Sequence, residues 1–240
     1  QLALRHADDA VTAAQQARLA GHVSVGLPST TAAILGAPFL QAMNERYPDI
    51  RLHLVEALSG HLADMLNGRL LDLAIVFHAE SARRWSIMPL LDEPLYLCAR
   101  RDMPGVPDGD TTRLDAIAHL PLVLPSGRHG LRALVNNAFQ QMGQTPRVVA
   151  EVDGLSLLMD VVQLGNAATI QPSSATARIA PGQLHMARID DAHLFRPNLL
   201  ASLSDDELSP AGLAARLVLA DVSRTLARDG KWAVVALHES

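Results

Sequence analysis

The sequence predicts an α/β fold built in two halves, and two observations support this prediction. From residue 22 onward, apolar runs of strand length alternate with stretches of helix length, an order typical of parallel sheets with right-handed crossovers. The order of strand, hydroxyl-rich turn, helix and strand then occurs a second time, after a segment at 103–110 that is dense in Pro, Gly and Asp. We therefore expect two α/β units with a passage between them at residues 99–104.

Residues 1–20 are expected to form a helix. Alanine is frequent there, Gly and Pro are absent, and Leu4, Ala7, Val11 and Ala14 recur at spacings of three and four. This stripe of small residues is too thin to anchor a core, but it suits close packing against another helix. Two interpretations remain open: an ordinary amphipathic helix, or the end of a longer dimerising helix.

The elements of the first half are bounded by turn and cap residues. Ser29, Thr30 and Thr31 follow Pro28 as N-cap residues, and Pro38 is expected to kink the helix that they begin. A continuous apolar run before Phe77 indicates a strand that is buried on both faces. The expected elements are strands at 22–27, 50–57 and 71–77 and helices at 32–47 and 61–67, followed by apolar runs at 87–91 and 95–100.

The second half repeats the alternation and ends in a long helix. Ser209 and Pro210 occupy its N-cap and first helical position, and Gly230 follows its end. The helices at 32–47 and 210–228 carry Ala, Gly and Leu on more than one face, so we expect at least a dimer. The expected elements are strands at 120–125, 147–152, 167–170 and 196–204 and helices at 130–142, 155–164 and 210–229.

Composition narrows the class of protein. The 240 residues are 49% hydrophobic and 19% charged, which excludes a disordered chain. The net charge of −5 argues against binding of a nucleic acid through the overall field of the chain, and no basic face stands out in the sequence. The single cysteine excludes a disulfide scaffold. No apolar run reaches membrane-spanning length and no signal peptide opens the chain, so we expect a cytoplasmic protein without membrane contacts. The first residue is Gln1, not Met, which favours a fragment.

Motifs for catalysis are missing from the sequence. Neither G-x-G-x-x-G nor a P-loop occurs, and Gly154-Leu155-Ser156 lacks the closing glycine of a nucleophile elbow. The 10 histidines show no H-x-H or H-x-x-x-H spacing. Cys98 lies in an apolar run and is expected to be a buried, inert thiol. We therefore expect no enzyme, no metal site and no cofactor.

Polar turns at the carboxyl ends of predicted strands are the candidate binding sites. Free backbone N–H groups and the helix dipole favour anions there, and open α/β sheets bind ligands at this edge. Simple helix capping explains each turn alone, whereas several turns that face one cleft favour binding. The candidate residues are Ser29, Thr30 and Thr31 in the first turn, Ser59 and Gly60 in the second, Ser126, Arg128 and His129 in the third, and Gln171 in the fourth.

Three motifs resemble the ligand-sensing region of LysR-type transcriptional regulators. They are the strand between Gly21 and Gly26, the step Tyr47-Pro48-Asp49, and the segment from Gly68 through Asp72-Leu73-Ala74-Ile75, which holds one extra residue before Asp72. The resemblance is good over 21–104, fair over 120–180 and weak beyond 180. Within the family, the chain is most similar to nitrogen assimilation control regulators.

The resemblance implies a transcription factor with an N-terminal winged helix-turn-helix, a linker helix and a sensor. The sensor would have two Rossmann-like subdomains, like periplasmic binding proteins of type II. Residues 1–20 would end the linker helix, 21–100 and 196–240 would form subdomain I, and 101–195 would form subdomain II. The DNA-binding part would be absent from this chain, so DNA would be a partner only through that part. A homodimer or homotetramer is also implied.

The resemblance further implies a small effector, a carboxylate or another anion, between the subdomains. Ser29 to Thr31 match the family's first effector-contacting turn, Ser59 and Gly60 the second, and Ser126 to His129 the third. Asn166 and Ala167 depart from the family's G-x-G pattern, which puts contacts near Gln171 in doubt.

Two alternatives share this architecture. A solute-binding receptor of a transporter would have no use for the helix at 1–20. An enzyme on the same fold would need a titratable pair in the cleft, and His129 with Glu151 is the candidate pair.

Overall fold

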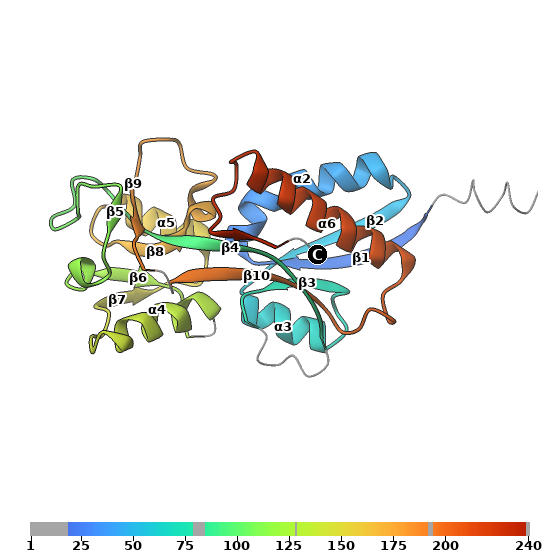
Figure 1. Cartoon of the computed structure of the whole chain (residues 1–240), viewed down its shortest axis with the longest axis horizontal. Helices are drawn as coiled ribbons and strands as arrows, with labels where there is room; N and C mark the ends of the chain where they lie inside the picture. Colours follow the sequence, from blue (N-terminus) through green and yellow to red (C-terminus); the bar gives the residue numbers. More distant parts are fainter. Residues whose placement is uncertain (1–18, 79–84, 128, 192–193, 239–240) are drawn as a thin grey trace, which may run out of the picture.

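The protein is described by a computed structural model that covers residues 19–78, 85–127, 129–191 and 194–238. The expected helix at 1–20 therefore lies almost entirely outside the described residues. Figure 1 shows an elongated molecule of two lobes, which are joined by two long strands at its middle. The subdomain boundaries expected from the sequence stay a prediction.

The first lobe contains the expected parallel strands. β1 (Gly21–Leu27) lies between β2 (Ile50–Glu56) and β3 (Leu73–Val76), and both neighbours run parallel to it. α2 (Ser29–Arg46) begins three residues before its predicted start at 32 and continues through Pro38. α3 (Ser59–Asn67) begins two residues before its predicted start at 61. Because all three strands point the same way, the turns after β1, β2 and β3 meet at the edge that faces the second lobe (Figure 1).

The two apolar runs at 87–91 and 95–100 belong to one strand, not to two. β4 (Ser86–Ala99) passes from one lobe into the other, and β10 (Phe195–Ser202) returns beside it in antiparallel register. Asp92 and Glu93 lie between the two runs, and Glu93 is fully buried with partners. β10 also pairs antiparallel with β3, so the sheet is mixed, with the order β2-β1-β3-β10-β4 in this part.

The second lobe is built on β4 and on a small parallel pair. β8 and β9 pair antiparallel with β4, β5 runs parallel to β9, and β6 runs parallel to β7. The sequence did not predict β5 or β9. The elements are β5 (Thr111–Thr112), β6 (Leu122–Leu124), α4 (Gly130–Gln141), β7 (Val148–Glu151), α5 (Leu155–Gln163), β8 (Thr169–Pro172) and β9 (His185–Ile189), with 3-10 turns η2 (Asp115–Ile117) and η3 (Ser173–Thr176).

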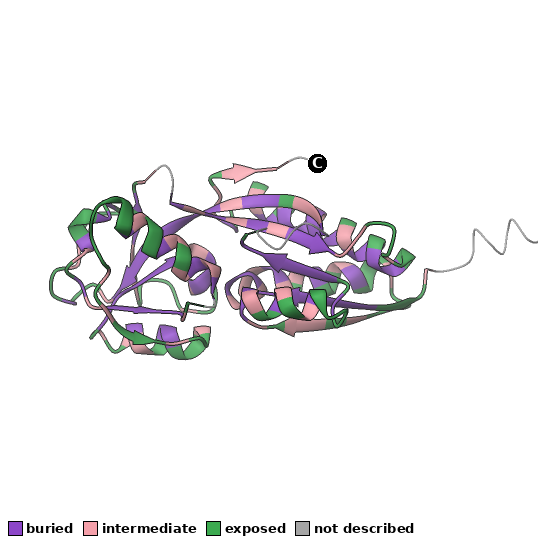
Figure 2. Ribbon diagram, turned by 90° about the horizontal axis from the view of Figure 1, so that it is seen from below, coloured by how far each residue is buried: buried purple, intermediate pink, exposed green. Residues whose placement is uncertain are grey.

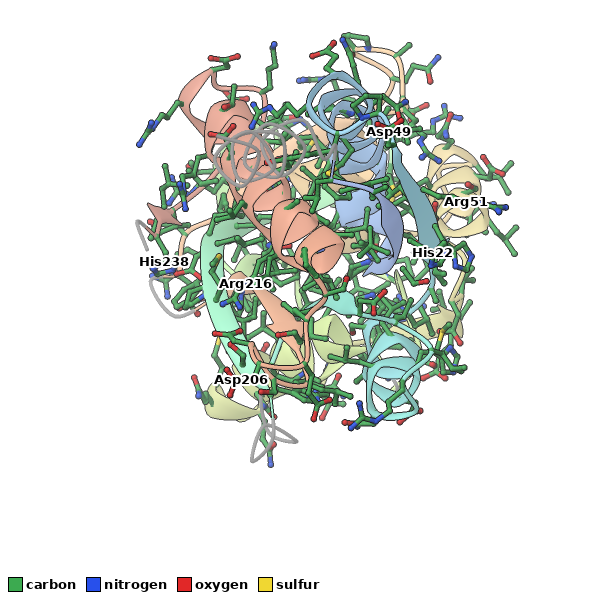
Figure 3. The ribbon with its side chains drawn as sticks, turned by 90° about the vertical axis from the view of Figure 1, so that its right-hand side faces the viewer. His22, Asp49, Arg51, Asp206, Arg216 and His238 are labelled. Atoms are coloured by element: carbon green, nitrogen blue, oxygen red, sulfur yellow. The ribbon has the colours of Figure 1, made fainter. Side chains whose placement is uncertain are left out.

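The C-terminal part returns to the first lobe. α6 (Pro210–Arg228) packs beside α2, as the end-on view of Figure 3 shows, and its N-cap Ser209 accepts a hydrogen bond from the Gly212 N–H at 3.1 Å. The short strand β11 (Ala236–Leu237) then pairs with β4.

Each lobe has its own apolar core, with buried strands inside and exposed outer helix faces (Figure 2). The first core includes Val23, Val25, Leu35, Phe39, Ala215 and Leu219. The second includes Leu97, Leu122, Leu131, Val135, Phe139 and Ile170.

Candidate functional site

The first predicted turn places its two threonines inside the protein. Thr30 and Thr31 are 4% and 0% exposed at the first turn of α2. The Thr30 Oγ1 accepts a hydrogen bond from the Arg196 Nη1 at 2.8 Å, and the Thr31 Oγ1 donates to the Asn198 Oδ1 at 3.1 Å. Ser29 is only half-buried, and its side chain forms no hydrogen bond with the described residues. The turn therefore offers a ligand one free hydroxyl, that of Ser29, and not three.

A buried ion pair that the sequence did not predict lies behind this turn. Arg196 on β10 donates through Nε and Nη2 to the Glu93 carboxylate on β4, and their side chains are 1% and 0% exposed. The Arg196 guanidinium carbon also lies 4.0 Å from the centre of the Phe77 ring, a cation–π contact. Burial lowers the pKa of Arg196, and the charge of Glu93 opposes that shift.

The second predicted turn touches the second lobe directly. Ser59 begins α3, is 2% exposed, and accepts a hydrogen bond through Oγ from the Gly130 N–H of α4 at 3.4 Å. Gly60 follows it and is half-buried. The N-cap of α3, Leu58, provides no side-chain hydrogen bond, so the first N–H groups of this helix have no side-chain acceptor from their cap.

The third predicted turn already holds a carboxylate of the protein. Ser126 donates to Asp153 through its backbone N–H at 2.8 Å and through Oγ at 3.1 Å. The backbone hydrogen bond lowers the pKa of Asp153 most, with a further contribution from the hydroxyl. Arg128 lies outside the described residues. A free anion at Ser126 would therefore have to displace Asp153.

His129 in the same turn has a structural role. It is 7% exposed, and its Nδ1 accepts a hydrogen bond from the Leu131 N–H at 3.1 Å, which caps α4. Its ring centre lies 5.6 Å from that of Phe77, so the contact joins the two lobes. Burial, together with the charge of Arg196, lowers the pKa of His129 to about 4. The imidazole is thus neutral at physiological pH.

The pairing of His129 with Glu151 that an enzyme would need is not found. The Glu151 carboxylate accepts from the Arg132 Nη1 at 2.8 Å instead. Cys98 is confirmed as a buried thiol, because it is 0% exposed and burial raises its pKa to about 12. Among the described residues, no group of three or more His, Cys, Asp or Glu side chains is placed to bind a metal ion.

Gln171 lies within β8 and not in a turn. It is 3% exposed, its backbone pairs with Tyr96 of β4, and its amide group forms no hydrogen bond within the described part of the chain. An amide in this state provides a donor and an acceptor for a ligand at the carboxyl end of β8.

Several hollows are lined by residues of both lobes. One, of about 160 Å³, lies between Glu56 of the first lobe and Asp160 and Arg178 of the second. Another, of about 220 Å³, lies beside α4 and is lined by Phe77 and Arg196 among others. The second of these hollows thus reaches the buried Arg196, whereas Ser29, Gly60 and Gln171 line neither of the two.

The arrangement matches a known family of sensor domains. The family model "LysR substrate binding domain" matches residues 16–224. The chain belongs to this family. The resemblance to LysR-type regulators and the expected two-lobed α/β fold are therefore confirmed, and the transporter receptor is not favoured. No helix in the described part of the chain has the length and hydrophobicity that a membrane span requires.

Similar proteins of known name are also LysR-type regulators. The nitrogen assimilation regulatory protein nac of Klebsiella aerogenes is 31% identical over 204 residues, which cover 84% of this chain and 65% of that protein. Its Escherichia coli counterpart is 29% identical over 222 residues, which cover 91% of this chain and 71% of that protein. The chain thus spans about two thirds of the length of these LysR-type relatives.

Solved structures share the fold. The effector binding domain of QuiR, in complex with shikimate, has a TM-score of 0.77 at 20% identity and covers 86% of this chain and 99% of its own. The CcmR regulatory domain of Synechocystis PCC6803, in complex with 2-PG, has a TM-score of 0.77 at 21% identity with the same coverage. At these identities the similarity establishes the LysR effector-binding fold.

Proposed function

We propose that this chain is the effector-sensing part of a LysR-type transcription regulator, in which a small molecule binds between the lobes. The observation that carries the proposal is the meeting of polar turns from both lobes, where Ser59 of α3 accepts from the Gly130 N–H of α4. A ligand that prefers one angle between the lobes would shift the population of that angle. A DNA-binding part outside this chain would carry the change to DNA.

The ligand is a small anion, held on the side of the first lobe. Ser29, Gly60 and the first N–H groups of α2 and α3 provide donors that no side-chain cap occupies. Gln171 adds an amide from the second lobe. Asp153 makes the Ser126 turn the least favourable place for an anion, since the carboxylate would repel it.

Calorimetric titration of the protein tests this site. The ligands are shikimate, 2-PG, amino acids and inorganic phosphate, because two proteins of the same fold bind the first two. We expect saturable heat with at least one anion, and a loss of affinity of tenfold or more, about 1.4 kcal/mol, in Ser29→Ala. Ser204→Ala, on the far side of the first lobe, is the control and should bind like the wild type. Equal affinity in Ser29→Ala and the wild type would refute this placement of the ligand.

We further propose that the sensor associates through its first lobe. Leu40 on α2 is 41% exposed, and Leu213 and Leu217 on α6 are 42% and 64% exposed, on helices that pack side by side (Figure 3). Light scattering after size-exclusion chromatography should give at least a dimer, and Leu217→Glu should shift the mass toward one chain. Arg113→Glu, on the second lobe, should leave the mass unchanged. A wild-type monomer at high concentration would contradict the proposal.

A further inference from the structure

The carboxylate of Glu93 accepts hydrogen bonds from three further side chains besides its ion-pair partner Arg196. Its Oε2 accepts from the Arg196 guanidinium and from the Asn198 Nδ2 at 2.9 Å. Its Oε1 accepts from the Ser174 Oγ at 2.7 Å and from the Trp232 Nε1 at 2.6 Å. All five residues are buried, so these groups have no competing water. Charge-assisted hydrogen bonds of this kind are strong and directional.

The donors come from both lobes. Ser174 lies in η3, beside the apolar residues that pack against α5 of the second lobe. Trp232 follows α6 and belongs to the core of the first lobe. Both donate to the same oxygen, Glu93 Oε1, so that one atom links the two lobes. Arg196 extends the link to the first turn of α2 through Thr30.

A guanidinium, an amide, an indole N–H and a hydroxyl are also the groups with which proteins bind a free carboxylate ligand. Here a side chain of β4 brings the carboxylate. Desolvating a carboxylate is costly, and only a complete set of partners compensates for it. The four donor side chains are therefore arranged to bind a carboxylate. They would lose their acceptor if Glu93 were replaced by a shorter residue.

We propose that Glu93 is a built-in carboxylate ligand, which ties the two lobes together without an effector. The cradle of Arg196, Asn198, Trp232 and Ser174 accepts a free small carboxylate when the Glu93 side chain is removed. The inference deepens the proposed function, because it concerns what sets the angle between the lobes that an effector would change. An effector bound at the Ser29 side then acts on lobes that are already linked.

The same contacts reach the C-terminal end of α6. Trp232 lies four residues after Arg228, the last residue of α6. Beyond it, β11 pairs with β4 at Asp92, and His238, labelled in Figure 3, lies with Nε2 3.2 Å from the Asp92 Oδ2. A shift of Glu93 relative to Ser174 would thus displace the segment that follows α6. α6 itself is one of the helices of the proposed dimer surface.

Chemical rescue tests the cradle. Glu93→Ala should melt below the wild type, and sodium acetate should raise its melting temperature in a saturable way, by roughly 5–10 °C at about 100 times the dissociation constant. Acetamide and sodium chloride of equal concentration should not. Asp92→Ala removes the neighbouring carboxylate of the same strand and is the matched control, for which no selective rescue is expected. Equal responses of Glu93→Ala, Asp92→Ala and the wild type to acetate would overturn the proposal.

A second measurement applies even where Glu93→Ala fails to fold. Ser174→Ala removes only the hydroxyl from the second lobe, and Ser173→Ala, one residue earlier, is its control. Spin labels are attached to cysteines introduced at the exposed positions Gln41 of α2 and Gln140 of α4. Double electron–electron resonance then reports the distance between the two labels, and thus between the lobes. We expect Ser174→Ala to broaden the distance distribution and Ser173→Ala to leave it unchanged.

An unchanged distribution in Ser174→Ala would refute the link between the lobes. Both experiments use the protein without an effector, so that their failure leaves the proposed anion site standing. Conversely, a failed calorimetric titration leaves the link standing.

Discussion

Two turns that look alike in the sequence face opposite environments in the structure. Ser29 to Thr31 in the first lobe and Ser126 to His129 in the second both follow a strand and begin a helix with hydroxyl groups. In the first turn, the threonines join a buried network around Glu93 and Arg196. In the second, Ser126 binds the exposed carboxylate of Asp153.

The difference shows that burial, not the local pattern, decides what a polar turn can do. A buried charge needs all of its partners, because removing one leaves the other desolvated and unpaired. An exposed carboxylate loses little when its partner leaves, since water replaces it. The two threonines of the first turn are therefore a permanent part of the fold, and only Ser29 is left for a ligand. The carboxylate at the second turn is exposed to water and is held less strongly.

Removing the guanidinium of the buried pair should have the largest effect. Arg196→Met leaves the Glu93 carboxylate without its cation, and we expect a loss of about 3–5 kcal/mol in the free energy of unfolding. Urea denaturation measures it. The control is Arg113→Met, which breaks the exposed pair with Asp115 at 3.1 Å and should cause no measurable loss. Similar losses in the two variants would mean that burial does not distinguish the two pairs.

The pH dependence contributed by His129 should come next in size. Its pKa in the folded protein, about 4, lies below the usual value of about 6.5, chiefly because of burial. Between these two values the unfolded chain binds more protons, so stability falls as the pH is lowered through this window, by at most about 3 kcal/mol. His129→Asn keeps an acceptor for capping α4 and removes the titration.

Urea midpoints of the wild type and of His129→Asn between pH 7 and pH 4 test this prediction. The difference in the free energy of unfolding between the two proteins should narrow as the pH falls. Only the wild type loses stability in this window, because its buried imidazole stays neutral while that of the unfolded chain binds a proton. A constant difference across the window would show that His129 is protonated as easily in the folded as in the unfolded chain.

The sequence was sufficient for the parallel part of the fold but not for the junction. Apolar runs of strand length located β1, β2 and β3, and the Ser209-Pro210 cap located the start of α6. β4 was divided into two apolar runs, and the partner of the charged Glu93 between them, Arg196, lies 103 positions away in the chain. Nothing in a single sequence indicates which two charged residues will be buried together.

For the candidate site, the positions of the turns could be predicted from the sequence, but their hydrogen bonds could not. The first three turns were located at the carboxyl ends of strands, because that position depends only on strand order, whereas Gln171 of the fourth lies within β8. The state of each hydroxyl was not predictable, since Thr31 is bound by Asn198 from a strand far along the chain and Ser126 by Asp153. A serine before a helix therefore indicates a candidate ligand site. Whether its hydroxyl is free to bind a ligand depends on hydrogen bonds that only the structure shows.

Removing the charge of Asp153 should have the smallest effect on stability and a distinct effect on binding. The Ser126 N–H lowers the pKa of Asp153, so its stabilising contribution is present above the usual pKa of the group and is lost as the pH falls through the folded value. Asp153→Asn should cost less than about 1 kcal/mol at pH 7, because the side chain is exposed, and nothing once the wild-type carboxylate is protonated. Urea denaturation of both proteins in a series from pH 7 downward measures how the difference between them declines.

Asp153→Asn also separates the two turns by their response to anions. Without the carboxylate, the Ser126 N–H and hydroxyl face an uncharged amide, and the affinity for inorganic phosphate measured by calorimetry should rise several-fold. Asp92→Asn, whose carboxylate lies beside His238 and away from this turn, should leave the affinity unchanged. A gain in both variants would indicate a response to net charge alone. A gain in Asp153→Asn only would mean that the second turn is an anion site that the protein keeps closed with an exchangeable carboxylate, whereas Glu93 cannot leave its donors without loosening the lobes.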